Sequence, residues 1–510
     1  MPEPAPPAVG RHVAVASIFM VALRLAFRLI GLVSTFILVR LLAPADFGLV
    51  ALATAVYSIL DLLTDMSFQM ALIRLPSLER KHLDTAWTLG ILRGVLIGGG
   101  LALSSGIVAD WMGEPRVQPI LWVLAGTAVL QGFENIGMVE FRRNLQFNKV
   151  FEYQIYSKVV SFCVGIPLAY LFRTHWALIA GIVSTRVFLI PYSYIIQSYR
   201  PRLSFAAFGE LFHFSKWFLL SNVLWVVDNY TSTILFSRIG GSAALGLFQV
   251  AWQVASLPAS EIAAPIRQPI YSGYAKLLGD IPALRRHFVE GLGLLLLVIG
   301  PMSVGLALTA NLASALFLGP KWAGATVLIQ LCAFYALFDA IGHFTHNVFT
   351  VLNRQRDFVV MFALILAIRF PVVVWTGQSW GVTAAVNALM ITAALNAVLW
   401  MWRVFPLLDL SLRALLRPVW RTVLASAVMA AVLLAGFNLT AGDDPFATVL
   451  LRAALAAFGG AVVYVAAQWL LWMLSGAPAD GPEAKLFGFA RSLAGKVLGG
   501  TFGARRAELG

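Results

Sequence analysis

Cysteine and charged residues are both scarce in this 510-residue chain. The two cysteines, Cys163 and Cys332, lie inside apolar stretches, which excludes a disulfide framework and any metal or iron–sulfur site built from several cysteines. Only 12% of the residues are charged, whereas soluble domains carry about 25%. The hydrophobic share is 60% and the mean hydropathy is +0.82. Because so apolar a chain could not hide its side chains from water, we expect a membrane protein rather than a soluble one.

Motifs of common membrane enzymes are missing as well. The sequence has no nucleophile motif, no nucleotide-binding loop and no DxD pattern for a metal. The outward connections between the apolar stretches are too short to hold an aqueous active site. We therefore expect a protein that is not an enzyme and needs no metal or cofactor.

About fourteen stretches are apolar enough to cross a bilayer as helices, which need roughly 20 residues each. None of the connections could fold as a water-soluble domain. The sequence thus predicts an all-α polytopic membrane protein. The expected spans are residues 13–39, 48–73, 87–109, 119–141, 151–171, 175–199, 217–237, 243–266, 287–312, 323–350, 357–376, 379–402, 419–440 and 447–474.

Lysines and arginines alternate from side to side of these spans. Of the 37 in the chain, 25 fall on one side, six on the other and six within spans. Positive residues concentrate on the cytoplasmic side of membrane proteins. The pattern predicts a multi-pass membrane protein with an even number of spans and both termini in the cytoplasm. It also explains the net charge of +13 without nucleic acid.

The sequence contains an internal repeat with an offset of 198 residues. Eight identical pairs align: Ser34 with Ser232, Thr35 with Thr233, Arg40 with Arg238, Ala45 with Ala243, Gly48 with Gly246, Leu49 with Leu247, Ala53 with Ala251 and Val56 with Val254. Parallel six-helix repeats are typical of transporters. We expect a disordered N-terminus (1–12), a first lobe (13–199), a cytoplasmic linker (200–216), a second lobe (217–405), two further helices (406–474) and a cytoplasmic tail (475–510).

Three segments resemble one transporter family. They are RLLAPADFGLVALA (Arg40 to Ala53), EFRRNLQFNKV (Glu140 to Val150) and VLNRQRDF (Val351 to Phe358). These segments are similar to the oligosaccharide flippases of the multidrug/oligosaccharidyl-lipid/polysaccharide exporter superfamily. The resemblance implies a V-shaped pair of lobes that alternates access. It also implies that undecaprenyl-pyrophosphate-linked sugars are moved outward.

Ionisable side chains within the spans are candidates for function, because they are costly in a bilayer. Arg24 and Arg28 share one helix face, and so do Asp61 and Asp65 on the next span. Helical rise places the two pairs within about one turn of each other in depth. The aspartates could simply neutralise the arginines, or could orient them toward pyrophosphate oxygens in a cavity.

Further charges lie in later spans of the first lobe. Arg186 is near mid-depth with no acid on its own helix, and is the clearest candidate for a phosphate contact. Lys158 is a second candidate, although Lys158 and Arg93 lie close to the cytoplasmic ends and could reach the interface by snorkelling. Glu134 is deep in the fourth span and could pair with Arg186 or Lys158.

The second lobe carries more acid than base. Asp339 with His343 one turn later is the predicted proton-relay pair, and Asp228 is the alternative site for a coupling ion or proton. A structural hydrogen bond between Asp339 and His343 is the other interpretation. Arg369 is the single basic residue inside a span of this lobe.

Three functions fit these patterns to different degrees. The first is a flippase for lipid-linked oligosaccharide, serving exopolysaccharide, capsule or lipopolysaccharide O-antigen synthesis. Its partners would be membrane lipid, a polysaccharide polymerase and assembly proteins. The second is a cation-coupled multidrug exporter of the same superfamily. The third, disfavoured by the short outer loops, is a membrane-embedded glycan polymerase or acyltransferase.

Overall fold

The computed structural model describes residues 30–484 except 32, 66–68, 70, 71, 74, 76, 145, 261–273, 275–278, 353, 443, 479 and 480. For residues 147, 211–225, 350 and 355 it describes the backbone alone. All regular structure in these ranges is helical. Eleven of the helices are long and apolar enough to cross a membrane, and one apolar helix is shorter. The predicted all-α membrane class is confirmed, and the number fourteen stays a prediction.

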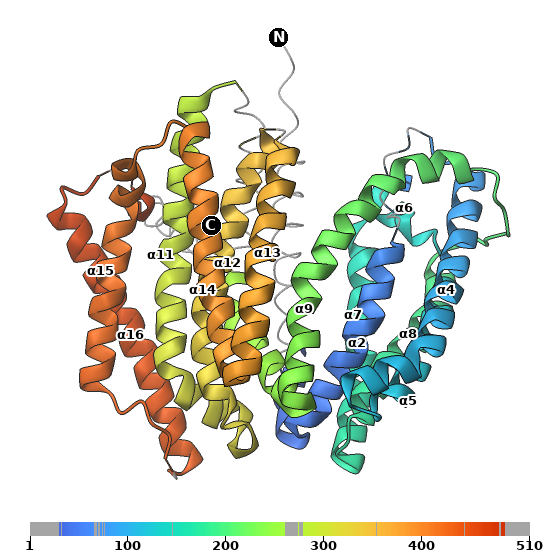
Figure 1. Cartoon of the computed structure of the whole chain (residues 1–510), viewed down its shortest axis with the longest axis horizontal. Helices are drawn as coiled ribbons and strands as arrows, with labels where there is room; N and C mark the ends of the chain where they lie inside the picture. Colours follow the sequence, from blue (N-terminus) through green and yellow to red (C-terminus); the bar gives the residue numbers. More distant parts are fainter. Residues whose placement is uncertain are drawn as a thin grey trace, which may run out of the picture. The chain divides into compact units, whose positions relative to one another are not determined.

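The chain packs as two compact units, Met1–Gln249 and Val250–Gly510 (Figure 1). The first unit holds α2 (Pro44–Thr64), α4 (Arg80–Met112), the shorter α5 (Val117–Gly132), α6 (Met138–Arg143), α7 (Phe147–Phe172), α8 (Trp176–Ile196) and most of α9 (Phe208–Ala255). The second unit holds α11 (Ile281–Ala313), η1 (Ser314–Leu318), η2 (Pro320–Trp322), α12 (Ala325–Val351), α13 (Gln355–Trp380), α14 (Val382–Leu407), α15 (Leu412–Gly436) and α16 (Phe446–Leu474).

A sharp bend divides α9 where a turn between two spans was expected. Gly241 has φ 71° and ψ −175°, a conformation that glycine adopts easily and other residues avoid. α9 therefore consists of two helices that meet at this glycine, and it covers parts of the expected spans 217–237 and 243–266.

Two glycines at equivalent positions of the repeat meet where α2 crosses α9. A Cβ atom on Gly48 would lie 1.6 Å from the carbonyl oxygen of Ser242, and one on Gly246 would lie 1.8 Å from that of Pro44. No side chain fits at either position unless the helices separate. The 198-residue repeat thus brings equivalent residues into contact, and the two backbones approach as closely as small residues allow in membrane proteins.

The segment between α8 and α9, residues 197–207, is fixed to the start of α4, and we call it the strap. The carboxylate of Asp84 accepts a hydrogen bond from the backbone N–H of Arg202 at 2.8 Å, and the hydroxyl of Thr88 accepts one from Ser204 at 2.9 Å. The Tyr199 hydroxyl also donates to Asp84. Side chains of α4 thus accept hydrogen bonds from backbone N–H groups of the strap, a role that carbonyl oxygens have within a helix.

One further contact links α4 to the first turn of α9. The Nδ1 atom of His82 accepts from the backbone N–H of Glu79 at 3.1 Å, and its Nε2 atom lies 2.9 Å from the Glu210 carboxylate. The hydrogen bond from His82, helped by the charge of Lys81, holds the pKa of Glu210 below its ordinary value. Glu210 is therefore ionised at neutral pH, and the base of α9 stays next to α4.

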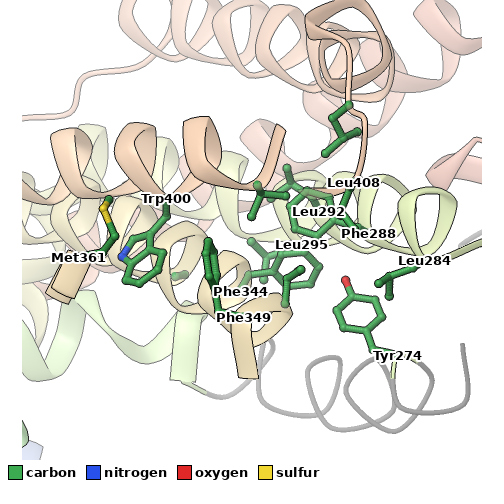
Figure 2. Packing of buried hydrophobic residues seen from close by; sticks show 14 of the residues in the cluster. Tyr274, Leu284, Phe288, Leu292, Leu295, Phe344, Phe349, Met361, Trp400 and Leu408 are labelled. Atoms are coloured by element: carbon green, nitrogen blue, oxygen red, sulfur yellow. The ribbon is translucent and has the colours of Figure 1, made fainter. Parts of the chain in front are cut away.

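The core of the second unit is aromatic. Phe288 of α11 packs against Phe344 of α12 with ring centroids 5.5 Å apart, and Phe349 meets Trp400 of α14 edge to face at 5.0 Å (Figure 2). All four side chains are almost fully buried. Edge-to-face and tilted aromatic pairs add to the stabilisation from buried area.

The last two helices belong to the same unit. α15 and α16 pack on α11 through a second apolar cluster that includes Leu297, Met429 and Tyr464. Beyond α16 the chain returns, and Glu483 forms a two-pronged ion pair with Arg421 at 2.7 and 2.9 Å, both side chains being buried. This pair fixes the end of the described chain against α15.

Candidate functional site

A cavity of about 530 Å³ lies within the first unit. Its walls come from α2, α4, α5, α6 and α7, from the segment that follows α2 and from the segment that joins α5 to α6. Polar groups in a membrane helix bundle are costly unless they face one another or water, and they then mark sites of function. The polar residues of the wall are Tyr57, Asp61, Asp65, Gln69, Trp87, Arg93, Gln131, Glu134, Asn135, Arg142, Tyr153 and Gln154.

The fourth expected span is broken where it borders this cavity. The sequence predicted one helix over residues 119–141, but α5 ends at Gly132 and α6 begins at Met138. The prediction of a continuous helix was therefore wrong. Non-helical backbone at membrane depth is tolerated only where it is buried in protein or lines a cavity. Residues 134–136 line the cavity, and Asn135 and Gly137 are buried.

Side chains near the end of α8 satisfy the backbone of this break. The N–H of Asn135 donates to the Ser193 hydroxyl at 3.1 Å, and the Gln197 amide donates to the carbonyl oxygen of Gly137 at 2.8 Å. The Asn135 side chain accepts from the N–H of Gly137 at 2.9 Å. The break is thus a fixed feature of the wall, held by the same segment that forms the strap.

Arg93 and Asp61 form an ion pair in the wall. The Arg93 guanidinium lies 2.7 Å from the Asp61 carboxylate and 2.6 Å from its carbonyl oxygen, and donates to the Thr64 hydroxyl at 3.2 Å. About a quarter of each charged side chain is exposed (25% and 30%). The sequence did not indicate this contact, and snorkelling of Arg93 toward the interface stays a prediction.

Two tyrosine hydroxyls complete the polar wall. Tyr57 donates to the Gln131 side chain at 2.7 Å, and Tyr153 donates to the Glu134 carboxylate at 2.7 Å. Glu134 was expected to pair with Arg186 or Lys158, but its hydrogen-bond partner is the tyrosine. The carboxylate stands in the broken segment, where it keeps acceptor capacity for other donors.

Arg186 lies beside this network on α8. Its charge acts on Asp61, Tyr57 and Tyr153, yet its guanidinium makes no hydrogen bond or ion pair with any residue in the described part of the chain. The side chain is half-buried. Arg186 is not among the residues that line the cavity. A planar guanidinium with all its donors available can nevertheless bind two oxygens of an anionic group such as a phosphate.

The remaining predicted residues of the first lobe are placed only in part. Asp65 lines the cavity one turn beyond Asp61, and Lys158 lies exposed on α7. Arg24 and Arg28 fall outside the described residues, so their pairing with the two aspartates stays a prediction.

In the second unit, Asp339 and His343 are in contact on α12. The carboxylate and the imidazole Nε2 atom are 3.3 Å apart, as the one-turn spacing predicts. Arg369 of α13 is buried and its charge acts on Asp339, a proximity that the sequence did not indicate. Asp228 lies half-buried in α9, within the first unit. Whether any of these groups carries a proton or binds an ion stays a prediction.

Metal ligands do not cluster in the part of the chain that the structure covers, since no group of three His, Cys, Asp or Glu side chains there could hold an ion. The sequence analysis also missed Tyr57 and Tyr153. Their signal was available, because a hydroxyl inside an apolar span needs a partner as a charge does.

Comparison with known proteins identifies the family. The profile of a family described as "polysaccharide biosynthesis protein" matches residues 37–327, more than half of the chain. The chain belongs to this family. The resemblance inferred from the sequence is confirmed.

Two curated relatives are similar over most of their length. The chain is 22% identical over 397 residues to the lipopolysaccharide biosynthesis protein WzxC of Escherichia coli, covering 77% of this chain and 80% of that protein. It is 22% identical over 418 residues to the teichuronic acid biosynthesis protein TuaB of Bacillus subtilis, covering 79% and 84%.

Solved structures show the same fold. The lipid II flippase MurJ in an inward closed conformation superposes with a TM-score of 0.71 at 13% identity, over 89% of this chain and 99% of that one. An inward-facing multidrug transporter of the MATE family has a TM-score of 0.58 at 13% identity, over 75% and 95%. These likenesses show that the chain shares the fold of these two proteins.

Proposed function

We propose that this protein moves undecaprenyl-pyrophosphate-linked oligosaccharide repeat units outward across the bacterial inner membrane by alternating access. The observation that supports this proposal most strongly is a cavity with charged walls inside a bundle of apolar helices long enough to span a membrane, in a chain of the polysaccharide biosynthesis family. Relatives named for lipopolysaccharide and teichuronic acid biosynthesis support a role in exopolysaccharide, capsule or O-antigen synthesis.

Recognition of the pyrophosphate falls to the arginines. Arg186 offers its guanidinium to phosphate oxygens in a two-pronged hydrogen bond, and Arg24, Arg28 and Lys158 add positive charge along the path. The carboxylates of the first unit, foremost Asp61, hold basic side chains in orientation, as the contact between Asp61 and Arg93 illustrates.

Energy coupling and partners complete the proposal. Asp339 with His343 is the group that carries a proton or faces a coupling ion, and Asp228 is the alternative. Both termini lie in the cytoplasm, and the product passes to a polysaccharide polymerase and its assembly proteins. The protein transports its substrate without chemical change.

Replacement of Arg186 tests the proposed function. Arg186→Ala should lower flipping of lipid-linked oligosaccharide in proteoliposomes at least tenfold, because a charge-assisted phosphate contact is lost. Arg186→Lys should restore only part of the rate, since an ammonium lacks the planar fork. Membrane abundance should stay near that of the wild type.

The matched control is Arg356→Ala, which removes an exposed arginine at the start of α13. This variant should flip lipid-linked oligosaccharide at the wild-type rate. Normal transport by Arg186→Ala, or loss of both Arg186 variants from the membrane, would contradict a role in substrate binding.

The multidrug exporter is the second candidate, favoured by the fold shared with the MATE transporter. Efflux of cationic dyes from cells that produce the protein distinguishes the two. Dye efflux that survives Arg186→Ala, together with no flipping of lipid-linked sugar, would replace the flippase by the exporter.

The proposed coupling of transport to a proton or ion gradient has a separate test. Asp339→Asn preserves volume and most hydrogen bonding but cannot ionise, so binding of lipid-linked substrate should persist. Transport in proteoliposomes should then lose its dependence on an imposed pH gradient, compared with the wild type. Gradient-driven transport that survives in Asp339→Asn would exclude this residue and direct attention to Asp228.

A further inference from the structure

Four aromatic side chains stack across the helices α7 and α8, and we call them the aromatic shelf: Tyr153, Tyr156, Phe188 and Tyr192. Tyr153 and Tyr156 are three residues apart on α7, and Phe188 and Tyr192 are four apart on α8, so each pair shares a helix face. The tyrosines and the phenylalanine thereby form one continuous surface of rings.

Contacts between the four rings hold them in fixed orientations. Tyr192 stacks on Phe188 with centroids 5.5 Å apart and planes 19° apart, and on Tyr153 at 6.2 Å and 18°. Tyr156 meets Tyr192 edge to face at 4.9 Å. Yet Tyr156 and Phe188 keep 40% and 37% of their surface exposed. The shelf is therefore preformed and still accessible.

Carboxylates hold the tyrosine hydroxyls of the shelf. Tyr192 donates to one oxygen of Glu152 at 2.6 Å, while Lys149 lies 3.1 Å from the other. Tyr153 donates to Glu134 at 2.7 Å. A carboxylate has about four acceptor positions, so Glu152, whose side chain is 38% exposed, can accept additional hydroxyl donors.

The shelf adjoins the cavity through Tyr153, which belongs to both, and through Gln154, which lines the cavity next to it. Arg186 lies six residues before Tyr192 on α8, about 9 Å along the helix axis. The charge of Arg186 also acts on Tyr153 of the shelf, so a ligand with a phosphate at Arg186 would have Tyr153 within reach of a neighbouring ring.

We propose that the aromatic shelf binds a pyranose ring of the saccharide that is attached to the lipid pyrophosphate. The electron-rich faces of aromatic rings attract the C–H groups on the apolar side of a sugar ring. Glu152 and Gln154 offer acceptors and donors for its hydroxyls. This inference rests on the proposed function, and it assigns recognition of the sugar to α7 and α8.

A belt of aromatic residues facing lipid is the competing interpretation. Such belts place single rings at the ends of spans, with their polar tips toward water. In the shelf the rings stack on one another, and two hydroxyls point at carboxylates. Lipid chains have no donors for Glu152, whereas a sugar has several.

Binding measurements on the purified full-length protein in nanodiscs test the shelf. The probes are undecaprenyl pyrophosphate carrying one N-acetylglucosamine, the same carrier with one galactose, and the bare carrier. The double variant Tyr156→Leu/Phe188→Leu keeps apolar bulk but removes the ring faces. It should bind the sugar-bearing probes roughly fivefold to tenfold more weakly, with bare-carrier binding unchanged.

Two variants serve as controls, and a third replaces the double leucine variant if it does not fold. Tyr170→Leu removes an aromatic ring that is 66% exposed elsewhere on α7 and should change no affinity. Tyr156→Phe/Phe188→Tyr keeps the rings and should bind all probes as the wild type does. Should the double leucine variant fail to fold, Phe188→Leu alone gives the same comparison.

The outcomes separate the two proposals. Equal weakening for all three probes, or no weakening for any, would overturn the shelf while the proposed function stands. A wild-type protein that binds none of the probes would overturn the proposed function, and the shelf with it. Glu152→Gln should weaken only the sugar-bearing probes, and an effect on the bare carrier would contradict its role as an acceptor for the sugar.

Discussion

Arg93 is tolerated inside a membrane helix because a carboxylate on another helix meets it. Its guanidinium has three oxygen contacts, two of them with Asp61. Burial of charge is costly, and the cost falls only when geometry and hydrogen bonds are favourable. The pair therefore stabilises the cavity wall only as a unit.

Removal of one member should show this dependence. Asp61→Asn leaves Arg93 without its counter-charge and should lower the free energy of unfolding by about 1–3 kcal/mol, less than for a fully buried pair because both groups are partly exposed. Asp61→Asn/Arg93→Gln should regain most of that loss. Thermal unfolding in detergent provides the measurement.

The exposed pair of Arg285 and Asp409 is the control, since the Asp409 side chain is 79% exposed. Asp409→Asn should change the free energy of unfolding by less than about 1 kcal/mol. A double variant at Asp61 and Arg93 that is no more stable than Asp61→Asn would show that the two groups do not act as a pair.

The sequence identifies charged residues in spans but not their partners. Depth counted along one helix placed Arg93 near a span end, which suggested snorkelling. The side chain contacts Asp61 and Thr64 of α2, which lie 32 and 29 residues earlier in the chain. Packing between the two helices sets this direction, and depth along one helix does not reveal it. Asp339 and His343 were predictable because both lie on one helix.

Among the helices, the crossing of α2 and α9 depends on the absence of side chains. Gly48→Ala would insert a methyl group against the backbone of Ser242, where no flexible side chain can give way. The helices must separate, which should lower both the unfolding temperature and the rate of transport. Overpacking of this kind costs typically 1–3 kcal/mol.

Gly99→Ala is the matched control, because a Cβ at Gly99 meets nothing within 4 Å. This change should be neutral or slightly stabilising, since alanine favours helix over glycine. Thermal unfolding of both variants compares them directly. A Gly48→Ala protein as stable as Gly99→Ala would mean that the crossing is looser than the structure indicates.

The break between α5 and α6 could not be read from hydrophobicity. Residues 119–141 form an apolar run, which predicts one helix. Asn135 and Gly137 were the local signs of a break, as both residues favour turns. What stabilises the break is Ser193 and Gln197, more than 50 residues away in sequence, and a single sequence does not reveal that contact.

For the molecule as a whole, composition and the long apolar runs predicted the class correctly. Scarce charge and long apolar runs leave a helical membrane bundle as the solution, because only helices and closed barrels satisfy backbone groups in lipid. The sequence repeat includes the aligned pair Gly48 and Gly246, and the close contact between their helices leaves no room for a larger residue at either position. The cavity was not visible, since its wall is assembled from five helices and from segments that join them.

Reporter fusions test the predicted orientation. A reporter fused after Ser475 should behave as cytoplasmic, and one inserted near Glu114 as periplasmic, because the positive residues lie on the side of the termini. Alkaline phosphatase and green fluorescent protein give opposite readouts for the two sides. A periplasmic C-terminus would remove the even number of spans.

The strap and the first turn of α9 are both fixed to α4 by hydrogen bonds. The strap's backbone is pinned to α4 at Asp84 and Thr88, and the first turn of α9 is tied to His82. Displacement of the first turn of α9 must therefore break these hydrogen bonds or move the start of α4, the helix that carries Arg93, along with it.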